Sequence, residues 1–324
     1  NMGEDPSEMG GYFIIDGKEK VIVSQDKFAD NALYIQEDPT DKISLSARIR
    51  SVSENSAKPV RTLTVKVIKE TPNISNSQIG VTIPNVRKDI PLFILMRALG
   101  VISDKDIIER CLLDIGNNSH YLNLLRPSIH DAGYIFTQEE AINFIKTFTK
   151  DKTTSHTMQI LMNYFLPHIG ELNFKNKSYY LGYIVKRLLM VMSNEIKPTN
   201  RDSYIYKRIE IPGTLISNLF NEYYTMQQKE IFLQMDKEYF FSEKNNADSY
   251  QNEDFIRLIM DNQTKIFNNR IVENGFKKAF KGDWGAEAHT KKVGALQDLS
   301  RLSYLAPLAQ MRKVVTPTGS DGAN

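Results

Sequence analysis

The chain has 324 residues and an almost balanced charge, with 41 Lys and Arg residues against 39 Asp and Glu residues. A formal net charge of +2 excludes a globally basic nucleic-acid binder, so such a role must depend on local clusters of cations. The single cysteine excludes an internal disulfide and a cysteine-rich zinc site, and no stretch reaches the ~18 apolar residues of a membrane span.

Strands are predicted for the first part of the chain, residues 11–83. The dipeptide Asp16-Gly17 separates two short apolar segments and is typical of a tight hairpin turn. In the segment 60–68, apolar residues alternate with polar ones, which indicates a strand with one buried face. The expected strands are 11–15, 20–23, 32–36, 43–52, 60–68 and 79–83.

From Ile90 onward the periodicity becomes that of helices. Gly100 fits the end of one helix, and Ser103 fits the N-cap of the next, with two Asp residues in its first turn. Cys111 lies in an apolar helical run, which favours a buried, unreactive thiol over a nucleophile. Longer helices are expected at about 138–149, 155–165, 178–195, 213–241 and 252–279.

The helix expected at 178–195 has an apolar face and several tyrosines. Tyr179, Tyr180 and Tyr183 favour the edge of a core over a platform that stacks on nucleic-acid bases. His168 precedes this helix without an acid–base partner nearby in the sequence, so we expect it to form a structural hydrogen bond.

The segment from Thr199 to Arg208 interleaves cations with tyrosines between two expected helices. Its Arg and Lys side chains can contact phosphates, while Asp202 and Tyr204 can read a base edge or stack on it. The residues alone leave open a second interpretation, in which this is a solvated loop whose charges pair with one another.

The last forty residues combine a tryptophan loop, an apolar repeat and two basic pairs. The loop Gly282–Gly285 holds the only Trp, and apolar residues recur from Val293 to Leu308 with an interruption at Pro307. The last sixty residues contain ten basic residues against five acidic ones. We expect a packed, hairpin-like element with a cationic loop at each end, suited to lie beside nucleic acid. The basic pairs are Lys291-Lys292 and Arg312-Lys313, and the expected closing turn is 316–322.

Dispersed blocks of this sequence resemble the second-largest, beta-type subunit of multisubunit DNA-directed RNA polymerases. They include Gly-Gly-Tyr-Phe-Ile-Ile-Asp-Gly at 10–17, Arg-Ala-Leu-Gly-Val-Ile-Ser-Asp at 97–104 and Gly-Asp-Trp-Gly at 282–285. Together the blocks extend over nearly the whole chain, and this makes the resemblance specific. They lie at 10–25, 90–108, 166–170, 177–189, 199–213 and 281–322.

The resemblance implies an α+β, multi-domain fold. A lobe of mixed β-sheet and helices, residues 33–207, is inserted into a discontinuous protrusion domain, residues 1–32 and 208–280. A fork hairpin, residues 281–324, follows. Residues 11–23 should then pack against the helices of 213–279. The chain is further expected to be a piece of a longer protein, and its many Asn and Lys residues suggest a large double-stranded DNA virus as its source.

In this family, the corresponding region forms one wall of the DNA cleft and helps hold the template and non-template strands apart during transcription. Asn200 departs from the family's usual acid, and Gln310 and Ser320 replace residues that are commonly His and basic, respectively. The DNA-binding residues implied by the resemblance are Arg201, Asp202, Lys207, Arg208, Lys291, Lys292, Arg301, Arg312 and Lys313.

The resemblance places the catalytic chemistry outside this chain. The nucleotidyltransferase activity belongs to the assembled DNA-directed RNA polymerase, and the catalytic magnesium is bound by the partner subunit, so no catalytic residue, metal site or cofactor is expected here. The implied partners are the largest polymerase subunit, other polymerase subunits and both DNA strands, without a membrane. The implied location is intracellular: the nucleus, or the cytoplasm or virion for a viral protein. The alternative is a non-enzymatic module that docks a protein partner.

Overall fold

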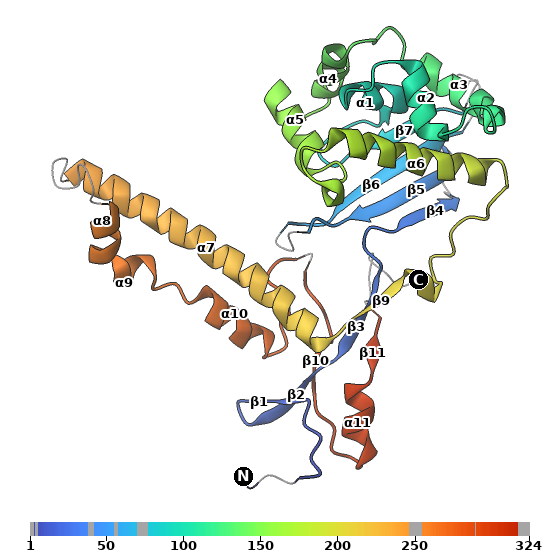
Figure 1. Ribbon diagram of the computed structural model, residues 1–324. Helices are drawn as coiled ribbons and strands as arrows, with labels where there is room; N and C mark the ends of the chain where they lie inside the picture. Colours follow the sequence, from blue (N-terminus) through green and yellow to red (C-terminus); the bar gives the residue numbers. More distant parts are fainter. Residues whose placement is uncertain are drawn as a thin grey trace. The chain divides into compact units, whose positions relative to one another are not determined.

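The computed structural model describes residues 3, 6–37, 42–54, 58–69, 77–245, 255–288 and 290–316, and it divides the chain into two compact units (Figure 1). Residues 29–206 form one unit, which we call the inserted unit. Residues 1–28 and 207–324 form the other, the host unit. Helices and several separate sheets occur together, so the predicted α+β class is confirmed. The expected domain names and boundaries stay predictions.

The inserted unit contains a five-stranded antiparallel sheet in the order β4–β5–β6–β7–β8. Along β6, Leu63, Val65 and Val67 are buried while the residues between them are at least partly exposed, which confirms the predicted alternation. The strands are β4 (Leu33–Glu37), β5 (Ile43–Ser51), β6 (Arg61–Ile68), β7 (Ile79–Thr82) and β8 (Ile90–Pro91).

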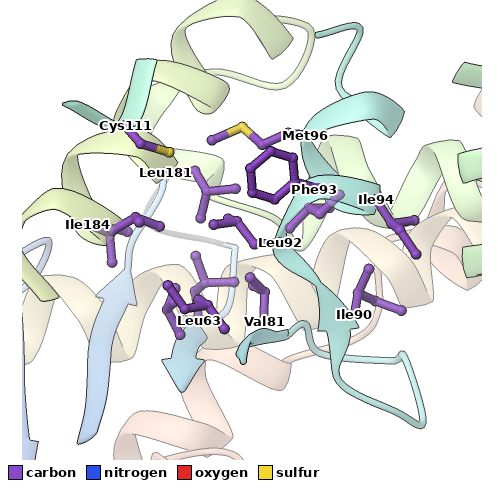
Figure 2. Packing of buried hydrophobic residues seen from close by; sticks show 14 of the residues in the cluster. Leu63, Val81, Ile90, Leu92, Phe93, Ile94, Met96, Cys111, Leu181 and Ile184 are labelled. Carbon is purple, nitrogen blue, oxygen red and sulfur yellow. The ribbon is translucent and has the colours of Figure 1, made fainter. Parts of the chain in front are cut away.

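Helices pack on this sheet around one apolar core. Every residue of α1 is buried, so this helix lies wholly inside the unit. Figure 2 shows Leu92 from α1 between the sheet residues Leu63 and Val81 and Leu181 from α6, all in one buried cluster. The helices are α1 (Leu92–Ala98), α2 (Asp104–Leu112), η1 (Ser119–Tyr121), α3 (Leu122–Asp131), α4 (Gln138–Lys146), α5 (Thr154–Asn163), η2 (Pro167–Ile169), α6 (Phe174–Met192) and η3 (Tyr204–Tyr206).

Several local predictions for this unit are confirmed. Gly100 follows α1 with a φ of +93°, a conformation that suits glycine. Cys111 is fully buried, and this burial raises the pKa of its thiol to about 12, as expected of an unreactive cysteine. His168 Nδ1 lies 2.7 Å from the hydroxyl oxygen of Ser51, which is the expected structural hydrogen bond. Ser103 does precede α2, but its side chain makes no capping hydrogen bond.

Two short sheets and a helical hairpin build the host unit. Asp16 and Gly17 have φ angles of +48° and +77° between β1 and β2, as in the predicted tight turn. The first sheet has the order β1–β2–β10, from β1 (Phe13–Ile15), β2 (Lys18–Ile22) and β10 (Leu296–Asp298). The second has the order β11–β3–β9, from β11 (Val314–Val315), β3 (Ser24–Phe28) and β9 (Lys207–Glu210).

The core of the host unit joins the N-terminal hairpin to the helices. Ile22 shares a buried cluster with Leu215 and Leu219 of α7 and with Trp284, and the rings of Phe13 and Phe280 lie 5.3 Å apart. The expected packing of residues 11–23 against the helices is therefore confirmed. The helices are α7 (Pro212–Asn245), α8 (Phe255–Asp261), α9 (Gln263–Ile266), α10 (Ile271–Ala279) and α11 (Leu305–Met311).

One expected helix is broken into three. The predicted helix 252–279 is instead α8, α9 and α10; its first three residues lie outside the described residues. The side-chain amide of Asn262 donates to the carbonyl of Leu258 at 3.1 Å, just after α8 ends. Asn side chains compete in this way with the helix backbone, and the pair Asn268-Asn269 follows at the next break.

The apolar repeat near the C-terminus is not a buried face, contrary to expectation. Val293 is 87% exposed and Leu302 is 96% exposed. Pro307 lacks a backbone N–H and is tolerated only in the first turn of a helix, so α11 begins just before it. The strands β10 and β11 pair with β2 and β3, so pairing between the two ends of this segment does not close the expected hairpin. The expected closing turn lies outside the described residues after Thr316.

Gly182 allows α2 and α6 to approach closely. A Cβ atom at this position would lie 2.3 Å from the carbonyl oxygen of Arg110. We therefore expect Gly182→Ala to lower the free energy of unfolding of the inserted unit by about 1–3 kcal/mol. Alkylation of Cys111, the only cysteine, at increasing urea concentration measures the free energy of unfolding of this unit. Gly116→Ala, at an exposed position, is the control. It should change the free energy of unfolding by less than about 0.5 kcal/mol.

Lys177 is a fully buried lysine whose Nζ donates to three backbone carbonyls, of Leu161 at 2.9 Å, Met162 at 2.8 Å and Glu171 at 3.2 Å. The first two belong to the last turn of α5, where a cation is favourable. Burial nevertheless lowers the pKa of Lys177 from 10.5 to about 8.

Lys177→Met should destabilise the inserted unit, because those carbonyls lose their donor. Between pH 8 and pH 10.5 the unfolded chain holds a proton at Lys177 that the folded chain has released, so rising pH increases the stability of the wild type. The gap in the free energy of unfolding between wild type and Lys177→Met should therefore widen between pH 8 and pH 10.5. Alkylation of Cys111 at increasing urea concentration measures this gap. Lys175→Met, at an exposed position on the same helix, should show no such widening. A constant gap would contradict the predicted pKa effect.

Candidate nucleic-acid interface

The strand pair β3–β9 gathers cations around one buried carboxylate. In the register of this antiparallel pair, Lys27 lies opposite Arg208 and Gln25 lies opposite Glu210. Opposite residues share a face of the sheet, so Lys27, Arg208 and Glu210 lie on one face. Glu210 is 6% exposed, and its carboxylate lies 3.8 Å from Lys27 Nζ and 2.5 Å from Lys292 Nζ. We call Lys27, Arg208, Glu210 and Lys292 the Glu210 cluster; it holds three cations and one anion.

Lys207 lies on the opposite face of the same strand pair. Its Nζ is 3.3 Å from the carboxylate of Asp26 and 4.0 Å from the ring centroid of Phe28. Its side chain is 17% exposed. The charge of Lys207 is therefore balanced within the host unit, and an ion pair and a cation–π contact hold the side chain in place.

Lys291 belongs to a tightly constrained loop after α10. It forms an ion pair with Asp283, which also pairs with Lys278 at 3.0 Å; Lys291 first and Lys278 second hold the pKa of Asp283 below its ordinary value. Glu222 of α7 fixes the loop by accepting from Ala286 N at 3.1 Å and from Thr290 Oγ1 at 3.0 Å. These contacts hold the loop backbone that carries Lys291 and Lys292 in place.

Arg301 contacts acids of the N-terminal segment. Its Nε and Nη2 donate to Glu19 at 3.0 and 2.8 Å, and Glu8 lies 3.7 Å from Nη2. Its guanidinium also lies 5.1 Å from the ring centroid of Tyr12. The paired Arg301 lowers the pKa of Glu19 below its ordinary value. This bidentate pair connects the segment after β10 to β2, so the geometry gives Arg301 a structural role beside its predicted DNA contact.

Arg312 and Lys313 differ from the other cations. Both are exposed and lie between α11 and β11, next to β3 in the same sheet as the Glu210 cluster. No described residue forms an ion pair with either side chain. They are therefore available to an external anion.

Arg201 and Asp202 lie in the inserted unit, just before η3. The backbone N–H of Asp202 donates to Asn200 Oδ1 at 3.0 Å, which forms a turn, and the Asp202 side chain is exposed. Tyr204 is 92% exposed, so its ring is open to stacking.

Sequence reasoning missed two members of the Glu210 cluster. Lys27 and Glu210 come from strands that are far apart in the sequence, and nothing local announces their pairing. The residues before Phe28, Ser24-Gln25-Asp26-Lys27, are all polar, so apolar alternation did not signal this strand. Three of the four predicted cations of the loop and β9, namely Lys207, Lys291 and Lys292, pair with acids of the host unit. Arg208 and Lys292 lie in the cluster.

Neither a metal site nor a membrane-spanning helix is found in the described part of the chain. Within it, no three His, Cys, Asp or Glu side chains gather as a metal site. None of the helices seen there combines the length and apolar character required to cross a bilayer.

Comparisons with known proteins show to which protein family the chain belongs. The family described as RNA polymerase Rpb2, domain 2 matches residues 31–210, more than half of the chain. The chain therefore belongs to the family of the second-largest RNA polymerase subunit, in agreement with the resemblance. A viral source stays a prediction.

Curated relatives match almost the whole chain. DNA-directed RNA polymerase II subunit 2 of Arabidopsis thaliana is 30% identical over 99% of this chain and 27% of its own length. Subunit RPB2 of Schizosaccharomyces pombe is 29% identical over 99% of this chain and 26% of its own length. Subunit Rpo2 of Saccharolobus solfataricus is 28% identical over 97% of this chain and 26% of its own length. The chain thus spans about a quarter of the length of the relatives that it matches.

The Glu210 cluster should stabilise the host unit through its central charge. Glu210→Gln keeps the shape and a hydrogen-bond acceptor but leaves two lysines beside a neutral side chain. We expect a decrease of about 1–3 kcal/mol in the free energy of unfolding. The fluorescence of Trp284, the only Trp and 3% exposed, measures unfolding of the host unit.

Glu273→Gln is the matched control for this substitution. Glu273 forms an ion pair with Lys277 at 2.6 Å on the surface of α10, and such exposed pairs contribute little. The decrease in its free energy of unfolding should stay below about 0.5 kcal/mol. Equal decreases for the two variants would show that the buried carboxylate has no special role.

Proposed function

We propose that this chain acts as part of the second-largest subunit of a DNA-directed RNA polymerase, where it forms one wall of the DNA cleft and helps keep template and non-template strands apart. The family membership supports the general role. The placement of Arg312 and Lys313 just before β11, the strand next to β3, supports the DNA contact most directly, because these exposed cations have no described internal partner.

The chemistry of this contact would be sequence-tolerant. Arg and Lys side chains bind phosphate oxygens, release counterions and carry little sequence information by themselves. Arg208 is a further exposed cation on β9. Lys207, Lys291, Lys292 and Arg301 would have to leave the acids that they contact before they could bind a phosphate. In the inserted unit, Asp202 and Tyr204 would meet an unpaired base rather than a phosphate.

Catalysis would depend on partner subunits. We propose that the largest subunit holds the catalytic magnesium, and that this chain contributes nucleic-acid contacts and structural support rather than reacting groups. Its place of action would be intracellular: the nucleus, or the cytoplasm or virion if its source is a virus.

The test uses the assembled polymerase with Arg312→Ala and Lys313→Ala combined. If both side chains contact phosphates, the half-life of the open or elongation complex should fall. The log–log slope of affinity against salt should flatten by about 0.9 for each phosphate that is no longer neutralised. The measurement is complex half-life and affinity at increasing salt for wild type and the double variant.

The matched control removes two cations from elsewhere in the host unit. Lys229→Ala and Lys237→Ala change the net charge equally at exposed positions on α7 and should leave the slope unchanged. Equal slopes for wild type and the Arg312/Lys313 variant would exclude the phosphate contact and favour the alternative, a module that docks a protein.

A further inference from the structure

The inserted unit contains a cavity of about 360 Å³ at the ends of α1 and α3 and the beginning of α2. Its lining includes Arg97 and Asp104 together with His130, Tyr134 and Phe136. None of these residues belongs to the proposed DNA contact, so the cavity requires its own explanation.

A buried guanidinium forms part of the wall. Arg97 is 2% exposed; its Nη1 donates to the carbonyl of Ile135, and its Nη2 donates to the carboxylate of Asp104. Its Nε is buried without a hydrogen-bond partner, and no other buried side-chain nitrogen or oxygen in the described part of the chain shares this condition. A buried N–H without an acceptor is unfavourable, so an oxygen that reached this nitrogen after a movement of the neighbouring Phe136 would stabilise it.

The charges of the cavity favour a neutral acceptor. Asp104 already balances the positive charge of Arg97, and its carboxylate lines the same cavity. An incoming carboxylate would therefore lie near the carboxylate of Asp104, which disfavours a second negative charge. A carbonyl oxygen meets the requirement of Arg97 Nε and introduces no charge.

The rim of the cavity is aromatic. The guanidinium carbon of Arg97 lies 5.3 Å from the ring centroid of Phe136, which is 57% exposed, and Tyr134 is 93% exposed. Because more than half of Phe136 faces solvent, its ring can turn aside at little cost and open the guanidinium. Tyr and Arg are enriched among the residues that contribute most to binding at protein–protein interfaces.

We propose that this cavity binds a neutral peptide segment of a partner protein, which inserts an aromatic side chain between Tyr134 and Phe136 and places a backbone carbonyl oxygen at Arg97 Nε. The ring fills the apolar part of the cavity and meets the rim in offset or edge-to-face geometry. The carbonyl satisfies the buried donor. The proposal does not depend on the DNA contact, because it rests on other residues.

The test measures the Arg97 Nε–Hε resonance of the full chain by NMR, assigned through the Arg97 side chain. N-acetyl-phenylalaninamide carries both the ring and a neutral carbonyl, and it should shift this resonance saturably with a dissociation constant of roughly 1 mM. N-acetyl-phenylalanine, with a carboxylate, should bind about five-fold more weakly. N-acetyl-alaninamide, without the ring, should produce no saturable shift.

Variants locate the binding site. Tyr134→Ala and Phe136→Ala should each weaken binding of N-acetyl-phenylalaninamide by about five-fold, as expected when one aromatic ring is removed from the rim. Leu172→Ala, which removes a 73% exposed apolar side chain elsewhere in the inserted unit, should leave it unchanged. The proposal is overturned if no probe shifts the resonance, if the alaninamide acts as well as the phenylalaninamide, or if all three variants bind alike.

Discussion

The buried carboxylate of Glu210 is the constraint on which the host unit depends most. A carboxylate that is 6% exposed costs free energy unless cations and donors compensate it. Lys27 from β3 and Lys292 from the loop after Trp284 supply that compensation. Three separate stretches of chain must therefore meet at one point, and their meeting fixes the sheet beside the helical hairpin.

This constraint changes how the cations of the host unit should be understood. Lys207, Lys291, Lys292 and Arg301 each contact an acid of their own unit, so their first effect is on folding. A phosphate that approaches them must compete with a carboxylate that is already in place. Such competition weakens indiscriminate binding of polyanions, and the proposed DNA contact would begin at the exposed pair Arg312-Lys313.

Much of the local structure could be predicted because its causes lie within a few residues. The turn at Asp16-Gly17, the glycine after α1 and the alternation along β6 each follow from backbone conformation or from burial of one face. The thiol of Cys111 was predictable for the same reason, since its neighbours in the sequence are its neighbours in the helix.

What could not be predicted depends on residues that meet only in the folded chain. The pairing of Lys27 with Arg208 and the burial of Glu210 have no local pattern. The regular leucines of the C-terminal segment were misleading, since Leu302 is almost fully exposed and periodicity alone does not tell whether a partner surface exists. The cavity at Arg97 likewise arises from α1, α2 and the end of α3 together.

The register of β3 and β9 has a consequence for the order of folding. Phe28 and Lys207 are directly opposite each other, so the chain leaves the host unit and returns to it at neighbouring positions. During synthesis, β3 must wait unpaired until the whole of the inserted unit has followed it. If that unit folds first, it brings its own two ends together and removes most of the loop-closure entropy that would otherwise oppose the strand pair. The inserted unit therefore prepares the host unit to fold, and a slow-folding inserted unit would leave β3 unpaired for longer.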